Sequence, residues 1–199
     1  MVAKVISGRE VAETILTTDL KNKVLELNKK NIKPKLIVML VGDMKASASY
    51  VAQKEKFAVK AGIESDIIRF EATVTEEEIL TQIDNINNDK SIHGVIVQLP
   101  LPDHISVTKV LNKIDPSKDV DGFTPTNVGK LFLGEDTLVS CTPKGIMQML
   151  ASTGTSLSGK NVTVVGRSNI VGKPVAILCL QQNATVTICH SRTKDLNSK

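Results

Sequence analysis

Lys35-Leu-Ile-Val-Met-Leu-Val-Gly42 is an unbroken apolar run, and it decides the fold. Strands that are half exposed alternate apolar and polar residues, whereas strands of a parallel sheet covered on both faces are apolar throughout. The run therefore predicts a central strand of a parallel sheet.

Two helical segments flank this strand. Ser7 and Glu10 form a capping box, which predicts a helix that runs to about Lys30. On the other side, residues 47–62 predict a second helix, with Ser47 as a possible N-cap and Gly62 as the C′ residue.

Strands and helices continue to alternate along the first half. Residues 66–70 predict a short strand, Thr75 and Glu78 form a second capping box ahead of a helix, and residues 94–100 predict another buried strand. This βαβαβ order predicts a mostly parallel sheet.

The second half follows a breaker-rich stretch at residues 115–125. We expect a helix after Cys141-Thr-Pro-Lys-Gly145, and then a strand, a helix and a strand at residues 161–166, 171–182 and 184–189.

We therefore predict an α/β fold with two domains. Residues 1–125 form a domain with a mostly parallel sheet, and residues 126–199 begin a second α/β domain.

Composition limits the function. The chain has 199 residues, 41% hydrophobic and 23% charged, which is typical of a globular protein. The net charge of +4 is spread along the sequence and only 3% of residues are aromatic, which argues against a nucleic-acid partner. No apolar run approaches the length of a membrane span.

Cysteine usage and the N-terminus favour a reducing, cytoplasmic compartment. Cys141, Cys179 and Cys189 are odd in number and widely spaced, and the first ten residues contain no apolar core of a signal peptide. The cysteines are most simply small buried hydrophobes.

Lys54 stands out because it occupies the apolar face of the predicted helix 47–62. At about 100° per residue, it shares a narrow stripe with Tyr50, Phe57 and Ala61, flanked by Val51 and Ala58. An ammonium there is desolvated, paired or snorkelling, and a partly desolvated amine is a candidate for proton transfer. The alternative is a stem that covers apolar surface with its charge in water.

Gln98 is the polar residue near the carboxyl end of the predicted strand 94–100, on the rim where ligands bind in open α/β sheets. Gly42 ends the strand before the Lys54 helix, so both segments lead to the same rim. Gln98 could instead satisfy backbone groups of the following loop.

Gly166-Arg-Ser-Asn-Ile-Val-Gly172 joins a predicted strand to a predicted helix and resembles a dinucleotide-binding turn. The spacing departs from G-x-G-x-x-G, because Ser168 replaces the second glycine and the third comes one residue late. Arg167 could meet the extra phosphate of NADP, and Ser191 follows the next strand, where the adenosine ribose is bound. Arg167 and Arg192 could equally be solvated surface charges.

Other signals fail on spacing. Asp119-Val-Asp-Gly122 begins like a calcium loop, but Phe123 and Lys130 occupy positions that need ligands. The cysteines and histidines lack paired metal-ligand spacing, and no nucleophile elbow argues for a hydrolase. We therefore predict no metal site.

Several strings together closely resemble the bifunctional methylenetetrahydrofolate dehydrogenase/methenyltetrahydrofolate cyclohydrolase family. They run the length of the chain in family order: Val41-Gly42-Asp43 with Ser47, Tyr50 and Lys54, Val97-Gln-Leu-Pro-Leu-Pro102, Lys118-Asp-Val-Asp-Gly-Phe123, Cys141-Thr-Pro-Lys-Gly145, Gly166-Arg-Ser-Asn-Ile-Val-Gly-Lys-Pro174 and Ala184-Thr-Val-Thr-Ile-Cys-His-Ser191.

The resemblance implies a folate enzyme of one-carbon metabolism that moves a hydride from 5,10-methylenetetrahydrofolate to NADP and hydrolyses the methenyl product to 10-formyltetrahydrofolate. Lys54 would handle protons, held by Gln98. Tyr50 would pack against the folate ring, Asp121 would accept hydrogen bonds from the pterin, and Ser47 would support the lysine. Leu99 and Pro100 complete the implied substrate site.

The resemblance also implies that residues 1–125 are a three-layer α/β catalytic domain that binds the folate, and that residues 126–199 are the first part of a Rossmann-type nucleotide-binding domain. It further implies a homodimer. Arg167 and Ser191 match positions that receive the 2′-phosphate of NADP, and Ser168 and Ile170 match the turn around the pyrophosphate and ribose. The other implied cofactor-binding residues are Gly166, Val171, Gly172 and His190.

Two departures from the family pattern matter. Ser140 stands where the family usually has proline, and family chains continue well beyond Ser191. We therefore expect the 199-residue chain to lack efficient dehydrogenase activity, to aggregate or be only marginally stable, and to retain at best weak folate binding. Because cyclohydrolase activity needs no hydride acceptor, we expect a trace of it more than of dehydrogenase activity.

Three interpretations stay open. In the first, the chain is the N-terminal portion of the folate enzyme. In the second, it is a relative that reduces another small substrate. In the third, it is a catalytically incomplete fragment that is at most a folate-binding or subunit-interaction module.

Overall fold

The computed structural model describes residues 5–42 and 45–198, with residues 45–50 described by their backbone alone. The chain divides into two compact units. One is Ala12–Val120, and the other combines Met1–Val11 with Asp121–Lys199. Each unit is an α/β structure, as predicted, while the predicted border after residue 125 stays a prediction.

The unit Ala12–Val120 is built on a parallel sheet of strand order β2-β1-β3. The central strand β1 (Lys35–Val41) is the apolar run that predicts the fold. β1 pairs in parallel with β2 (Glu64–Phe70) and with β3 (Gly94–Val97). β2 begins earlier than predicted, and β3 ends earlier, so Gln98 follows the strand.

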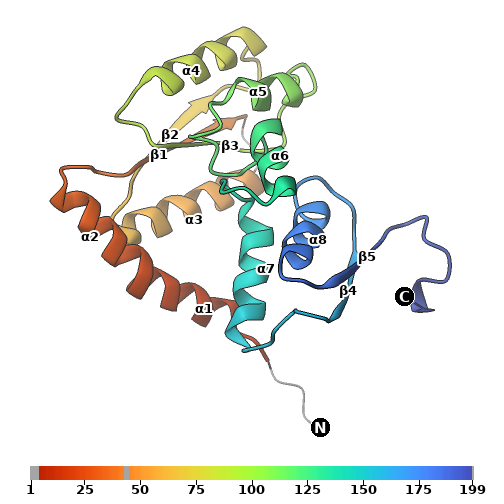
Figure 1. The fold of residues 1–199 in the computed structure, drawn as a ribbon. Helices are drawn as coiled ribbons and strands as arrows, with labels where there is room; N and C mark the ends of the chain where they lie inside the picture. The colour runs from red at the N-terminus through yellow and green to blue at the C-terminus, as the bar shows by residue number, and fades with distance from the viewer. Residues whose placement is uncertain (1–4, 43–44, 199) are drawn as a thin grey trace. The chain divides into compact units, whose positions relative to one another are not determined.

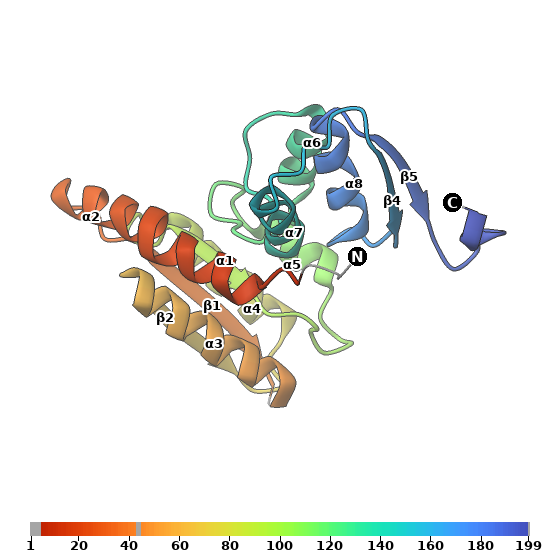
Figure 2. The same ribbon diagram turned by 90° about the horizontal axis from the view of Figure 1, so that it is seen from below.

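Helices cover both faces of this sheet and make three layers (Figures 1 and 2). On one face, Met39 of β1 packs with α4 (Glu76–Asn88) and α5 (Val107–Lys113). On the other face, Val38 and Leu40 of β1 pack with Val51 of α3 (Lys45–Ala61). Successive side chains of a strand point to opposite faces, so one apolar run supplies both cores.

The termini of the helices follow local chemistry. α4 has the predicted capping box, because the Thr75 hydroxyl accepts from the Glu78 amide and the Glu78 carboxylate accepts from the Thr75 amide. α3 ends at Ala61 with Gly62 as the predicted C′ residue, at φ +81°. The amides of Gly62 and Ile63 donate to free carbonyls in the last turn of the helix, those of Val59 and Ala58. The predicted N-cap at Ser47 is wrong, because α3 already begins at Lys45.

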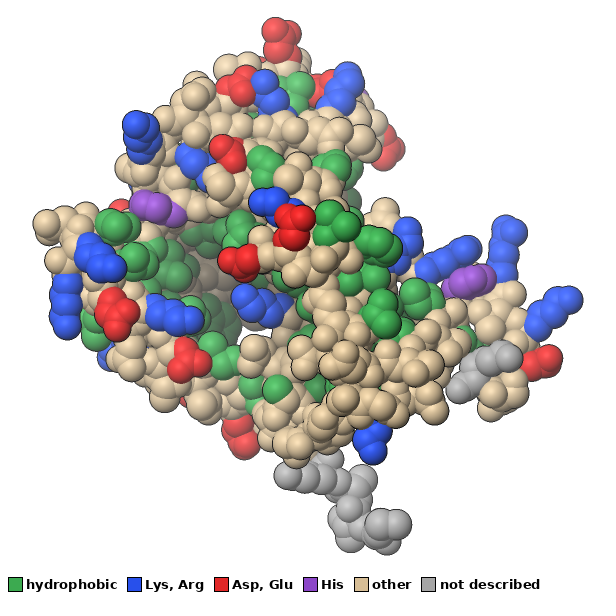
Figure 3. All heavy atoms as spheres, viewed as in Figure 1, with side chains coloured by type: hydrophobic (Ala, Val, Ile, Leu, Met, Phe, Trp, Pro, Cys, Tyr) green, Lys and Arg blue, Asp and Glu red, His purple; other side chains and the backbone are tan. Residues whose placement is uncertain are grey.

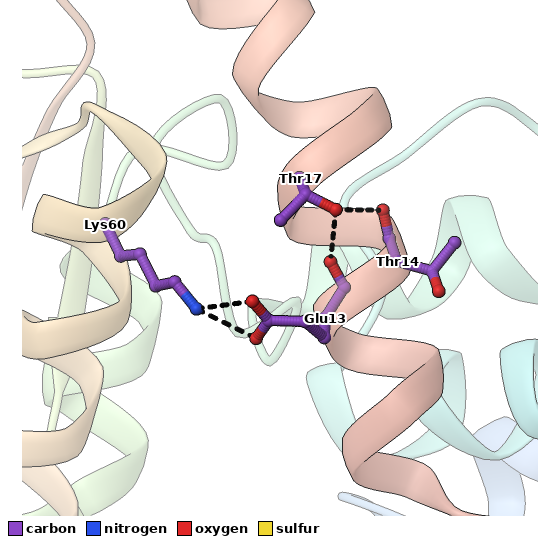
Figure 4. Close-up of polar contacts among 4 residues, drawn as sticks. All are labelled: Glu13, Thr14, Thr17 and Lys60. Carbon is purple, nitrogen blue, oxygen red and sulfur yellow. Dashed lines mark hydrogen bonds and ion pairs between the residues drawn. The ribbon is translucent and has the colours of Figure 1, made fainter.

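The N-terminal helical segment is divided by a π-helix. α1 (Gly8–Thr14) leads through η1 (Ile15–Leu20) into α2 (Lys21–Lys29). The Thr17 and Thr18 hydroxyls donate to the carbonyls of Glu13 and Thr14, four residues earlier, at 2.8 and 2.6 Å. Threonine hydroxyls bound to these carbonyls loosen the regular helix ladder, which the capping pattern does not predict. Figure 4 also shows Lys60 of α3 bound to the Glu13 carboxylate at 2.6 Å.

The unit that contains Asp121–Lys199 holds a parallel pair of strands, β4 (Asn161–Val165) and β5 (Thr185–Cys189). α8 (Gly172–Gln181) connects them and packs with α7 (Cys141–Ser152) through Cys179 and Met147. α6 (Pro125–Leu133) precedes them, and the short η2 (Leu196–Ser198) follows.

Three features of the helices correct the sequence analysis. α5 and α6 were not predicted, although Ser106 caps α5, and Thr124 and Pro125 begin α6. α7 begins at Cys141 instead of after Gly145. Cys141 is consequently exposed, unlike Cys179 and Cys189, so the prediction of a buried residue is wrong for Cys141.

Among the described residues, no helix is long and apolar enough to cross a membrane.

Candidate active site

Lys54 and Gln98 meet at the carboxyl end of the first sheet. Lys54 lies in the middle of α3, and Gln98 follows directly after β3. The Lys54 Nζ donates a hydrogen bond of 3.1 Å to the Gln98 Oε1 in a partly buried setting. The Lys54 ammonium is therefore paired with a partly buried amide instead of being fully solvated.

The burial of α3 matches the predicted flanks, Val51 and Ala58, better than the predicted stripe itself. Val51 is fully buried, and Ala58 and Ala61 are buried as well. Phe57 is 49% exposed, so its predicted place in the buried stripe is wrong. The helix therefore packs through its small and β-branched residues, which leaves Lys54 at the margin of the buried face.

Gln98 is held in one orientation by its own loop. Its Nε2 donates to the Leu99 carbonyl at 2.8 Å, and its backbone amide donates to the Met39 carbonyl at 2.9 Å. A carbonyl can only accept, so the amide nitrogen must face Leu99 and the amide oxygen must face Lys54. Gln98 therefore has both of the roles considered for it. Its Nε2 satisfies a backbone carbonyl of the loop, and its Oε1 binds the lysine.

The loop that carries Leu99 and Pro100 is tied to the start of α4. The Leu99–Pro100 peptide is cis. His104 Nε2 donates to the Val74 carbonyl at 2.9 Å, since that carbonyl can only accept.

The Glu76 carboxylate of α4 binds the same loop further along the chain, at Ser106 and Lys109, and we call this pair of bonds the Glu76 clamp. Glu76 accepts from the Lys109 ammonium at 2.6 Å and from the Ser106 amide at 2.8 Å. The hydrogen bond from Lys109, followed by that from Ser106, lowers the pKa of the Glu76 carboxyl below its usual value. No local pattern in the sequence predicts these bonds, because Ser106 and Lys109 lie about 30 positions after Glu76.

Three other predicted site residues are not seen in contact with Lys54 or Gln98. The side chains of Ser47 and Tyr50 lie outside the described residues. Asp121 is partly buried and is the first residue of the second segment of the other compact unit. The next residue, Gly122, has φ +65°, and a Cβ there would lie 3.0 Å from the Ser140 amide nitrogen. Only glycine fits this turn.

The predicted dinucleotide turn joins β4 to α8. Gly166 has φ +146° with open space where a Cβ would point, so a ligand could approach its backbone. A Cβ on Gly172 would collide with the Gly166 carbonyl, so the strand and helix meet as closely as glycine permits. The geometry fits a turn that brings backbone close to a pyrophosphate.

Ser168 caps this turn. Its hydroxyl accepts from the amides of Val171 and Gly172, each at 3.2 Å. Those two amides already have a partner, so Val171 and Gly172 contribute the shape of the turn. The exposed Ile170 offers its carbonyl to the Ser140 hydroxyl at 2.9 Å, which links the turn to the start of α7.

Polar and basic residues collect where β4 and β5 end. Val165 pairs with Cys189, and the Gly166 amide donates to the Cys189 carbonyl at 2.8 Å, so the next residues of both strands emerge at the same edge. Arg167 and Ser191 are exposed there, with His190 partly exposed. Figure 3 shows Lys and Arg side chains gathered beyond the end of β5 beside a histidine. Such an edge fits an anionic group of a dinucleotide.

No cluster of His, Cys, Asp and Glu suited to a metal ion occurs among residues 5–42 and 51–198.

Together these features define a class: an α/β protein with a lysine–glutamine pair at a parallel-sheet rim and a Rossmann-type βαβ unit. Family models give the specific assignment. The tetrahydrofolate dehydrogenase/cyclohydrolase catalytic domain matches residues 6–121, and the NAD(P)-binding domain of the same family matches residues 140–199. The chain belongs to the tetrahydrofolate dehydrogenase/cyclohydrolase family.

Individual relatives agree with this assignment. The bifunctional protein FolD of an Exiguobacterium species is 54% identical over 194 residues, which cover 98% of this chain and 69% of the relative. The bifunctional FolD enzyme of Campylobacter jejuni has a similar structure, with a TM-score of 0.95 and 43% identity over 98% of this chain and 69% of that one.

A relative from Trypanosoma brucei was solved in complex with NADP and an inhibitor. It has a TM-score of 0.90 and 38% identity, over 96% of this chain and 66% of that one.

Proposed function

We propose that this chain oxidises 5,10-methylenetetrahydrofolate to 5,10-methenyltetrahydrofolate with NADP, and hydrolyses the product to 10-formyltetrahydrofolate. The observation that carries the proposal is the 3.1 Å hydrogen bond between Lys54 and Gln98 at the sheet rim. Family membership supplies the substrate class, and the turn between β4 and α8 supports the nucleotide.

Lys54 is the proton-handling residue of this proposal. Adding water to the methenyl carbon releases a proton, and opening the ring places one on a folate nitrogen. An amine near that carbon can perform both transfers. Gln98 Oε1 holds the Nζ in place and, because its orientation is fixed by the Leu99 carbonyl, always presents an acceptor to the ammonium.

The remaining substrate residues bind and orient the folate. Asp121 accepts hydrogen bonds from the pterin, because a carboxylate is an acceptor-only group. Tyr50 packs against the ring system, and Ser47, Leu99 and Pro100 complete the binding surface.

NADP, when bound, supplies the hydride acceptor. Arg167 and Ser191 hold its 2′-phosphate through charge-assisted and hydroxyl hydrogen bonds. The turn and edge that would hold the rest of the dinucleotide are formed by Gly166, Ser168, Ile170, Val171, Gly172 and His190.

We further propose a cytoplasmic homodimer. The odd number and wide spacing of the cysteines support the compartment, and the resemblance to the family supports the dimer. Light scattering coupled to size-exclusion chromatography measures the assembly, and a monomer at micromolar concentration would contradict the dimer.

The test is the hydrolysis of 5,10-methenyltetrahydrofolate by Lys54→Met. Methionine keeps an apolar stem and removes the amine, so the rate should fall by about 10² to 10⁴. Lys56→Met is the matched control, because Lys56 lies on the exposed side of the same helix and should retain the rate.

Two results would contradict the proposal. A loss below about tenfold in Lys54→Met would return Lys54 to a surface-covering role. An unmodified chain that binds the folate but converts none would favour the incomplete folate-binding module instead.

A further inference from the structure

Lys118 fastens one segment of the chain to the end of α4. Its Nζ donates to the carbonyls of Ile86, Asn87 and Asp89 at 2.6, 2.9 and 2.7 Å. The end of a helix leaves carbonyls without helical partners and carries a partial negative charge, which favours a cation. An ammonium has three protons, so these bonds use its full donor capacity.

Neighbouring bonds hold the chain leading to Lys118 against the same helix end. The Asn87 side chain donates to the Lys113 carbonyl at 2.8 Å and accepts from the Asp115 amide at 3.0 Å. Asp115 in turn accepts from the amide and hydroxyl of Ser117, at 2.8 and 2.7 Å, which lowers its pKa. The turn before Lys118 is therefore fixed at several points.

The residues after Lys118 run beside β3. The Val95 amide donates to the Lys118 carbonyl at 2.8 Å, and Val95 forms a parallel bridge with Asp119. Val120 packs closely on Gly94, because a Cβ added to Gly94 would lie 2.6 Å from the Val120 Cγ1. The next residue in the chain is Asp121, the proposed pterin acceptor.

We propose that Lys118 is a positioning residue for Asp121. It holds the segment that delivers Asp121, and it cannot itself bind the substrate while its protons are donated to α4. This inference rests on the proposed function, because it assumes that Asp121 binds the folate.

A double-mutant cycle tests it, with the dissociation constant of tetrahydrofolate measured by calorimetry under anaerobic conditions. Asp121→Asn and Lys118→Met should each weaken binding about tenfold or more, because each removes a hydrogen bond to a charged group or its alignment. The double variant should bind no more weakly than Asp121→Asn alone, because Lys118 acts through Asp121.

Controls separate positioning from general destabilisation. Lys113→Met also removes an ammonium bound to α4, by its 2.7 Å ion pair with Asp84, and should leave the affinity unchanged. Lys118→Arg keeps donors for the carbonyls and should recover part of the affinity. If Lys118→Met fails to fold, Lys118→Gln replaces it in the cycle, because a glutamine amide has only two protons for the three carbonyls that Lys118 binds.

The outcomes are distinguishable. If Asp121→Asn weakens binding and Lys118→Met does not, or if their losses multiply in the double variant, the positioning role is wrong and the proposed function stands. If Asp121→Asn binds like the unmodified chain, the proposed role of Asp121 is wrong, and the positioning role fails with it.

Discussion

The two parallel sheets differ in how many of their faces are covered. In β1, Val38 and Met39 are fully buried although they point to opposite faces. In β4 and β5, Val165 is 68% exposed and Ile188 is 42% exposed. The difference is already present in the sequence: β1 is apolar throughout, whereas threonines interrupt β4 and β5. Apolar patterning therefore reports how many faces of a strand the unit covers by itself.

The helices of the two units repeat this contrast. Ile79, Ile83 and Ile86 of α4 are almost completely buried. In the other unit, Phe132 of α6 is 70% exposed, beside an open apolar groove of about 600 Å³ that Ile177 and Ile188 also line. Apolar side chains in this groove contribute less to stability than those of α4, because more of their surface stays in water.

Matched truncations give the largest expected effect. Ile83→Ala empties a fully buried position and should cost roughly 2–5 kcal/mol, whereas Ile188→Ala should cost less than about 1 kcal/mol. Native-state hydrogen exchange measures each unit separately, which matters because two units can unfold independently. Equal costs would break the comparison, since exposure would then not determine what these residues contribute.

Local signals in the sequence predicted much of the fold. β1, the capping box of α4 and the glycine end of α3 each depend on residues within a few positions of one another. The start of α3 was misplaced because Ser47 is a good N-cap that the structure does not use as one. α6 has local signals at both ends, because Thr124 and Pro125 begin it and Gly134 ends it.

The candidate site was predictable only in part. The helical stripe singled out Lys54, and the rim rule singled out Gln98, so their contact follows from topology. The Glu76 clamp and the Lys118 bonds join residues about 30 positions apart. No periodicity or local motif encodes such a contact, and it depends on how α4 lies against the segments after β3.

A second prediction concerns the exposed residues that follow β4, and it tests whether Arg167 distinguishes NADP from NAD. Arg167→Ala should weaken NADP binding roughly 10- to 150-fold, the equivalent of the 1.5–3 kcal/mol typical of a charged hydrogen bond, and change NAD binding little. Lys160→Ala is the control, because Lys160 precedes the same strand at its opposite end. Fluorescence titration with both nucleotides measures the ratio. Equal weakening of NAD and NADP would show that Arg167 maintains the turn and does not read the phosphate.

The smallest expected effect is a pH dependence of the stability of the unit Ala12–Val120. Bonds from Lys109 and Ser106 lower the pKa of Glu76, so the folded state binds its proton less readily than the unfolded state. Its contribution is therefore fully present above the ordinary pKa of a glutamate and is lost as the pH falls through the lowered folded value. Glu76→Gln should be less stable than the unmodified chain at neutral pH, and this gap in stability should narrow on acidification.

Glu77→Gln removes an exposed charge from the same turn and controls for the helix dipole. Thermal melts across this pH range measure the gap. A gap that stays constant, or widens towards acid, would show that the carboxylate does not hold the loop after β3 through its charge.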